Sequence, residues 1–316
     1  MALTGTILVL RALGLGDLLT GVPALRGLRA AYPDDHLVLA APEPLRPLVE
    51  LIDAVDELLP TPGLGSLRWR GGAPRVAVNL HGRGPQSIRD LAAVGAQTLL
   101  THRHPDFPEF PGPRWPDELH EVRRWCRLLA YAHIAADPRA LALPAPNMAA
   151  AESNVVVIHP GAASAARRWP TAHFATVARA LGAQGHRVVI TGSADEVPLA
   201  TALARDAGLS PSVVYAGRTD LAELAAIVAD AALVVCGDTG VGHLATAFGT
   251  PSVLLFGPTP PQAWGPPADA GNHIALWAGA AGDPHADRPD PGLLSITPEQ
   301  VLSAATELVG QGVRHG

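Results

Sequence analysis

Short, strongly apolar segments alternate along this chain with segments of helical periodicity, and the alternation runs through the chain twice. In the first half, the predicted strands are residues 6–11, 37–41, 55–59, 75–80 and 97–101. In the second half, they are residues 155–159, 187–191, 212–216, 232–236 and 252–256. Strands that are separated by helices form parallel sheets with helices on both faces. The sequence therefore predicts an α/β protein with two doubly wound parallel sheets.

The length of 316 residues is enough for two domains. Residues 137–153 carry prolines and small residues without periodicity, which is typical of a linker. We therefore predict an N-terminal domain over 1–150 and a C-terminal domain over 151–316. A capping-box pattern predicts a last helix over 297–309. We leave open whether this helix packs back on the N-terminal domain.

The charge and the residue types exclude several functions. A formal net charge of −6 argues against general binding of nucleic acid or of anionic membranes. All 23 basic residues are arginines, so the chain has neither a P-loop lysine nor a Schiff-base lysine. The sequence contains no Asp-x-Asp pair and no Cys-x-x-Cys motif, so we predict no metal site. No apolar run is long enough to span a membrane, and a cytoplasmic location is expected, with peripheral membrane contact left open.

A glycine-rich loop follows the first predicted strand and contains Gly14, Gly16 and Asp17. The third glycine of a dinucleotide-binding fingerprint is absent, because Leu19 stands in its place. Asp17 has two interpretations. It either caps the helix that begins here or faces an acceptor as a general base, with the two glycines allowing the acceptor close to the backbone.

A second polar loop, residues 79–84, follows the strand at 75–80. His81 and Arg83 lie in this loop at the presumed ligand-binding edge of the sheet, which makes them candidate acceptor contacts. An exposed loop with a surface arginine would have the same sequence, so both interpretations stay open.

The second half has two candidate phosphate-binding segments. Arg167 and Arg168 lie in the glycine-rich segment 159–170 and form either a phosphate clamp or a solvated pair. Asp238, Thr239 and Gly240 lie where a strand gives way to a helix, whose N-terminus could hold a diphosphate. His243 lies one helical turn further on, as a ligand contact or as a structural histidine.

Three segments together resemble glycosyltransferase family 9, the heptosyltransferases that use ADP-heptose. They are ILVLRALGLGDLLTGVPALRGLRAAYP, HPGAASAARRWPTAHFATVARAL and DTGVGHLATAFGTPSVLLFGPTPPQAWGP. The resemblance implies the GT-B fold, in which two Rossmann-like domains face a central cleft. It also implies an inverting, metal-independent transfer that needs no cofactor, with the acceptor bound mainly by the first domain and the nucleotide-sugar mainly by the second.

The resemblance also implies roles for individual residues. Asp17 matches the family's catalytic aspartate, which would deprotonate the acceptor hydroxyl. Thr239, Gly240 and the arginines at 167 and 168 would stabilise the leaving diphosphate. His243 matches the family's histidine in the same motif, and Arg167 occupies a position where the family commonly has lysine. Glu223 is a weaker candidate for a contact to the nucleotide ribose.

The acceptor and the reaction are less constrained than the fold. The acceptor is either lipopolysaccharide core, which is usual for the family, or another glycan or a small natural product. A nucleotide-sugar epimerase or hydrolase is the alternative enzyme, because one fold hosts several reactions. A nucleotide-sugar-binding protein without catalysis is the third interpretation.

Overall fold

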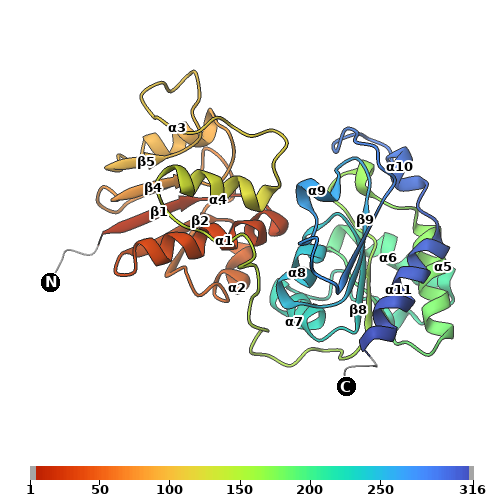
Figure 1. The fold of residues 1–316 in the computed structure, drawn as a ribbon. Helices are drawn as coiled ribbons and strands as arrows, with labels where there is room; N and C mark the ends of the chain where they lie inside the picture. Colours follow the sequence, from red (N-terminus) through yellow and green to blue (C-terminus); the bar gives the residue numbers. More distant parts are fainter. Residues whose placement is uncertain (1–4, 313–316) are drawn as a thin grey trace. The chain divides into compact units, whose positions relative to one another are not determined.

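The computed structural model describes residues 5–312, which form two compact units (Figure 1). Unit 1 extends up to Leu141 and unit 2 begins at Ala142. This division lies inside the linker segment 137–153 and somewhat before residue 150, where we expected the first domain to end.

Unit 1 contains a sheet of five parallel strands in the order β3-β2-β1-β4-β5. The strands are β1 (Thr6–Leu10), β2 (His36–Ala41), β3 (Glu57–Pro60), β4 (Val76–Asn79) and β5 (Thr98–Leu100). Residues 7–10 of β1 are completely buried, as expected for a central strand that helices cover on both faces. The five strands that the sequence predicts in this half are confirmed, with bounds that differ by one or two residues.

A helix or helical turn follows each strand of unit 1 except β3, which a loop connects directly to β4. These elements are α1 (Leu15–Ala31), the 3-10 turn η1 (Glu43–Leu45), α2 (Arg46–Val49), α3 (Gln86–Ala92) and α4 (Glu121–Tyr131). Helices α1 and α4 pack against each other. This contact brings the start of α4 to the loop that begins α1, although the two segments lie far apart in the sequence.

Unit 2 contains a second parallel sheet in the order β10-β9-β8-β6-β7. Its strands are β6 (Val156–His159), β7 (Val188–Ile190), β8 (Leu233–Gly237), β9 (Ser252–Phe256) and β10 (His273–Trp277). Strand β10 was not predicted, although residues 274–277 form a short apolar run, and most of its residues are only half-buried.

The predicted strand at 212–216 is wrong. Residues Pro211–Val213 form the 3-10 turn η4, and Val214 makes a single bridge to Ile190 of β7. Ser210 begins this turn by accepting a hydrogen bond from the backbone N–H of Ser212, a local contact that competes with strand pairing.

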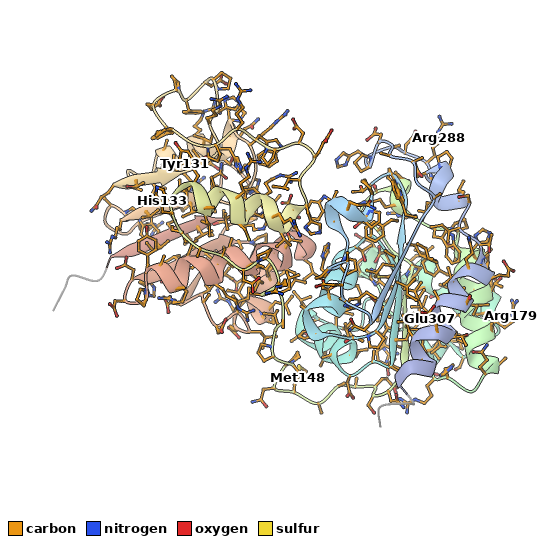
Figure 2. The ribbon with its side chains drawn as sticks, viewed as in Figure 1. Tyr131, His133, Met148, Arg179, Arg288 and Glu307 are labelled. Carbon is orange, nitrogen blue, oxygen red and sulfur yellow. The ribbon has the colours of Figure 1, made fainter. Side chains whose placement is uncertain are left out.

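Unit 2 contains more helices and turns than unit 1. Besides η4, they are η2 (Ala165–Arg167), α5 (Thr171–Ala183), η3 (Ala194–Glu196), α6 (Val197–Ala207), α7 (Leu221–Ala229), α8 (Gly240–Phe248), α9 (Pro261–Trp264), α10 (Pro291–Leu294) and α11 (Pro298–Gly312). Helix α11 packs against α5 and against the sheet of its own unit. Arg179 and Glu307 lie on the exposed faces of α5 and α11 (Figure 2).

In each sheet, successive strands are added first toward one edge and then toward the other. The two neighbouring strands between which this change occurs form the switch point of the sheet. In unit 1 this happens between β1 and β4, where Leu10 pairs with Asn79. In unit 2 it happens between β6 and β8, where His159 pairs with Cys236. Open α/β sheets bind ligands at the carboxyl ends of such strand pairs. The loops after β1, β4, β6 and β8 are therefore the places to examine for a functional site.

Candidate active site

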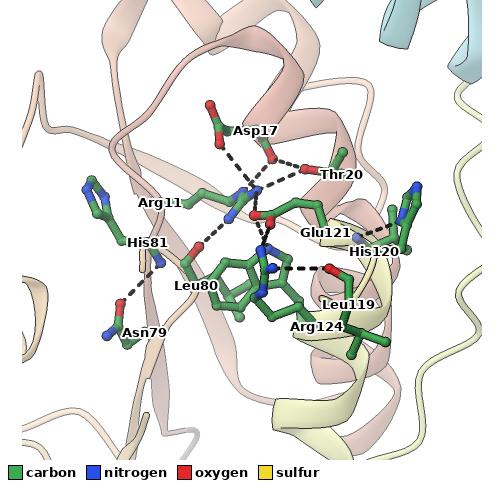
Figure 3. A network of polar contacts seen from close by, with 12 residues as sticks. Arg11, Asp17, Thr20, Asn79, Leu80, His81, Leu119, His120, Glu121 and Arg124 are labelled. Carbon is green, nitrogen blue, oxygen red and sulfur yellow. Dashed lines mark hydrogen bonds and ion pairs between the residues drawn. The ribbon is translucent and has the colours of Figure 1, made fainter. Parts of the chain in front are cut away.

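A fully buried arginine ties together the two loops at the switch point of unit 1. Arg11 is 0% exposed and donates from Nε to the backbone carbonyl oxygen of Asp17 and from Nη1 to that of Leu80 (Figure 3). Its Nη2 lies 2.9 Å from Oγ1 of Thr20, which itself donates to the Asp17 carbonyl oxygen at 2.9 Å. The backbone around Asp17 is therefore held by side chains that water does not reach.

Asp17 is the third residue of α1, and its side chain is 28% exposed. Burial raises the pKa of its carboxyl group, and the neighbouring Arg11, at 3.8 Å from Oδ1, opposes that rise. The backbone N–H of Gly14, the exposed N-cap residue, also favours the charged form of the carboxyl group and lowers its pKa. Asp17 thus combines a contact that stabilises the helix start with a partly accessible carboxylate of raised basicity. Gly16 is half-buried in the same helical turn.

Glu121, the first residue of α4, lies on the opposite side of the Arg11 guanidinium. Sequence reasoning missed it, because an acidic residue in the first turn of a helix is ordinarily explained by the helix dipole. The signal that could have found it is the placement of a carboxylate on the apolar side of the helix, four residues before Trp125.

His81 follows β4 and is half-buried, whereas Arg83 is exposed. The backbone N–H of His81 donates to Oδ1 of Asn79 at 3.1 Å, which fixes the turn. Burial and, to a smaller extent, the charge of Arg11 lower the pKa of the His81 imidazole to about 4. His81 is therefore neutral at pH 7, and its buried Nδ1 has no hydrogen-bond partner within the described part of the chain.

At the switch point of unit 2, Asp238 and Arg167 lie in contact. Asp238 is 8% exposed, and burial raises the pKa of its carboxyl group to about 6, while Arg167 opposes that rise. Arg168 points elsewhere, since its Nε donates to the backbone carbonyl oxygen of Ala162 at 3.0 Å and so supports the glycine-rich turn after β6. Arg167 and Arg168, which are adjacent in the sequence, thus make different contacts.

A recess lies beside the N-terminus of α8. Thr239 is the N-cap residue of this helix, with no hydrogen bond from its side chain to the helix backbone, and Gly240 is the first helical residue. The recess is lined by Gly237, Asp238, Thr239, Gly242, His243, Thr246, Leu254, Phe256, Trp264 and Pro266. The rings of His243 and Trp264 meet edge to face with their centroids 6.1 Å apart. Trp264 was not singled out as a site residue, although it lies within the third matching segment, at the end of the short helix α9.

Glu223 is not among the residues that line this recess. It is the third residue of α7, and its Oε2 accepts a hydrogen bond from the backbone N–H of Asp220 at 2.8 Å. Asp220 accepts one in return from the backbone N–H of Glu223, also at 2.8 Å. This capping box gives Glu223 a structural role, and it leaves Oε1 without an assigned contact.

Within residues 5–312, no group of three or more histidine, cysteine, aspartate or glutamate side chains is arranged to hold a metal ion. Among the same residues, none of the helices is both long and apolar enough to cross a bilayer.

Two doubly wound parallel-sheet units define a protein of the GT-B fold class, as the sequence predicts. The family model of glycosyltransferase family 9 (heptosyltransferase) matches residues 115–289, more than half of the chain. The chain therefore belongs to glycosyltransferase family 9.

Individual relatives agree with this assignment. Lipooligosaccharide heptosyltransferase 2 of Haemophilus influenzae is 32% identical over 168 residues, which span 51% of this chain and about half, 49%, of that protein. Lipopolysaccharide heptosyltransferase 2 of Escherichia coli is 26% identical over 96% of this chain and 99% of its own length. The crystal structure of a family 9 glycosyl transferase from Veillonella parvula superimposes with a TM-score of 0.78 at 22% identity, covering 98% of this chain and 99% of that one.

Proposed function

We propose that this chain is an inverting, metal-independent heptosyltransferase that moves a heptose from ADP-heptose to a hydroxyl group of lipopolysaccharide core. The observation that carries the proposal is the carboxylate of Asp17, which is partly exposed at the switch point while a buried arginine holds its backbone. Family membership and the names of the relatives support the choice of sugar and acceptor.

In the proposed reaction, Asp17 takes the proton of the acceptor hydroxyl as its oxygen attacks the anomeric carbon of the donor. The bond from that carbon to the diphosphate oxygen breaks on the opposite face, so ADP leaves and the configuration inverts. A carboxylate whose pKa is raised by burial is a stronger base than one in water. Gly14, Gly16, His81 and Arg83 are the proposed contacts of the acceptor.

The donor belongs to unit 2 in this proposal. Arg167 and the free N–H groups at the start of α8, at Thr239 and Gly240, stabilise the charge that develops on the diphosphate. Arg168 supports the turn after β6, and His243 lines the recess beside the same helix. Glu223 is proposed to contact the ribose through Oε1, so that its capping contact persists.

In this reaction, Arg167 and the N–H groups at the start of α8 neutralise the diphosphate in place of a divalent cation. Turnover is accordingly expected to be unchanged by EDTA. A loss of activity in EDTA that Mg²⁺ restores would contradict metal independence while leaving the transfer itself in place.

The test of the proposed function is the variant Asp17→Asn, assayed by ADP release from ADP-heptose with lipopolysaccharide that lacks its heptoses as acceptor. Loss of a general base lowers the rate by about 10²- to 10⁴-fold, and the affinity for ADP should not change. A rate within a few-fold of the unsubstituted protein would contradict the proposal. NMR analysis of the product distinguishes transfer with inversion from release of free heptose, which a hydrolase would give.

A further inference from the structure

Four charged side chains of alternating sign, beginning with Asp17, follow one another into the interior of unit 1 (Figure 3). Arg11 Nη2 lies 3.8 Å from Oδ1 of Asp17 and 3.2 Å from Oε1 of Glu121. Oε2 of Glu121 pairs in turn with Arg124. The side chains of Arg11 and Glu121 are 0% and 5% exposed, compared with 28% for Asp17. Only the Asp17 end of this series therefore offers a broad surface to a substrate.

The buried carboxylate of Glu121 has a partner on each side. Besides Arg11 and Arg124, it accepts a hydrogen bond from Nε1 of Trp125 at 2.8 Å. The Trp125 ring also lies beneath the Arg11 guanidinium, 5.0 Å from its central carbon. A first-turn acid that served only the helix dipole would stay in water, because burying a charge costs several kcal/mol unless partners compensate it. The arrangement instead directs Glu121 at Arg11.

We propose that Glu121 is a positioning residue for the transfer reaction and acts on Asp17 through Arg11. This inference rests on the proposed function, in which Asp17 is the base. The first effect is geometric: Glu121 fixes the guanidinium that holds the backbone carbonyl oxygen of Asp17. The second effect is electrostatic, because a carboxylate behind Arg11 compensates a cation that would otherwise weaken Asp17 as a base.

The charged and titratable groups around Asp17 determine the sign of the second effect. Arg11, from the loop after β1, lowers the pKa of Asp17, and Glu121, from α4, raises it. Arg124, on the same helix as Glu121, is paired with Glu121. His81, from the loop after β4, is neutral at pH 7 because its own pKa is lowered to about 4. Removing the charge of Glu121 therefore leaves burial alone to oppose the effect of Arg11, and the pKa of Asp17 falls.

The test is the pH dependence of kcat/KM for Glu121→Gln, with ADP-heptose and heptose-free lipopolysaccharide. Because a base must be deprotonated to act, the rate falls on the acidic side of the pKa of Asp17. Glu121→Gln should move this acidic limb to lower pH by on the order of half a unit to one unit. The rate at the plateau should fall by about 2- to 10-fold, since a base of lower pKa is weaker, with KM for ADP-heptose unchanged. The control Glu118→Gln removes an exposed charge three residues earlier and should leave the limb in place.

A second variant keeps the inference testable if Glu121→Gln does not fold, as judged by circular dichroism and thermal melting. Arg124→Gln removes the cation on the far side of Glu121 and retains a donor, so it should move the acidic limb to higher pH. Opposite shifts in the two variants support the inference, because a purely structural role would not reverse the sign. A limb that does not move in the folded variant, or that moves in the wrong direction, overturns it.

The outcomes also separate this inference from the proposed function. If Asp17→Asn is inactive and the acidic limb of Glu121→Gln stays where it was, the inference on Glu121 is overturned and the role of Asp17 stands. If Asp17→Asn remains active, both are overturned.

Discussion

Arg167 and Asp238 are 71 residues apart in the sequence and meet where β6 and β8 end. Nη1 of Arg167 lies 3.3 Å from the backbone carbonyl oxygen of Asp238 and 3.9 Å from Oδ2 of its carboxylate. The side chain of Arg167 is 25% exposed, whereas that of Asp238 is 9% exposed. The buried partner thus fixes a guanidinium that keeps part of its surface available to a ligand at the start of α8.

This geometry predicts that Arg167→Ala weakens the binding of ADP. A charge-assisted hydrogen bond contributes about 1.5–3 kcal/mol, so the Kd should rise about 10- to 100-fold. The Kd of Arg167→Lys should lie between those of the unsubstituted protein and Arg167→Ala, because an ammonium group keeps the charge but lacks the planar fork of the guanidinium. Isothermal titration calorimetry measures the effect, with Arg179→Ala, on the exposed face of α5, as the matched control. Equal affinities of Arg167→Ala and the control would remove Arg167 from the donor site.

Asp238→Asn should stabilise the protein at pH 7. Burial raises the pKa of Asp238 to about 6 from 3.8, so the folded state prefers the protonated form. The contribution of Asp238 to stability is complete below the unfolded pKa of 3.8 and is lost as pH rises through 6. At pH 7 the carboxylate therefore costs on the order of 1–3 kcal/mol, which asparagine avoids.

Urea unfolding at pH 7.5 and at pH 4.5 measures this difference. Asp238→Asn should gain free energy of unfolding at the higher pH and approach the unsubstituted protein at the lower one. The same gain at both pH values would show that titration of Asp238 is not the cause.

The strands and the positions of the loop residues could be predicted because they depend on local sequence. Runs such as 156–158 are apolar on both faces, which is the signature of a strand buried in a parallel sheet. Once two parallel sheets are inferred, residues in the segments that lead from a strand into the next helix, such as Asp17 and Asp238, must lie near the carboxyl edges. The order of strands and helices therefore suffices to predict the edge of the sheet at which these residues lie.

The contacts behind those residues could not be predicted in the same way. The pairing of Arg11 with Glu121 joins residues 110 apart and depends on how α4 packs on α1. Likewise, the apolar letters of 212–216 suggested a strand, but the serine and proline before them produce a turn. Long-range packing determines the pairing of Arg11 with Glu121, and local hydrogen bonding determines the turn at 211–213. Neither leaves a periodic pattern of residues in the sequence.

His81 should remain uncharged throughout the neutral pH range. Because burial and the charge of Arg11 lower its pKa to about 4, its imidazole C2–H resonance should stay constant between pH 8 and pH 5.5. The resonance is assigned by its loss in His81→Gln. A neutral imidazole offers one donor and one acceptor, which suits a hydroxyl group. If the resonance titrates with a midpoint near 6.5, the loop around His81 is more open in solution than in the structure.

Gly161→Ala should destabilise the protein, because a Cβ at this position would overlap the carboxylate of Glu196. That carboxylate accepts a hydrogen bond from the backbone N–H of Ser193 at 2.8 Å, and its displacement removes half of a capping box. Loss of a cap costs about 0.5–2 kcal/mol, which urea unfolding resolves.

Gly182→Ala is the matched control. Its added Cβ would lie 3.5 Å from Leu209, an ordinary van der Waals distance, and the position is inside α5. Alanine favours a helix over glycine by about 0.5–1 kcal/mol, so the control should gain stability. If Gly161→Ala and Gly182→Ala changed the free energy of unfolding in the same direction, the assigned role of Glu196 would be contradicted.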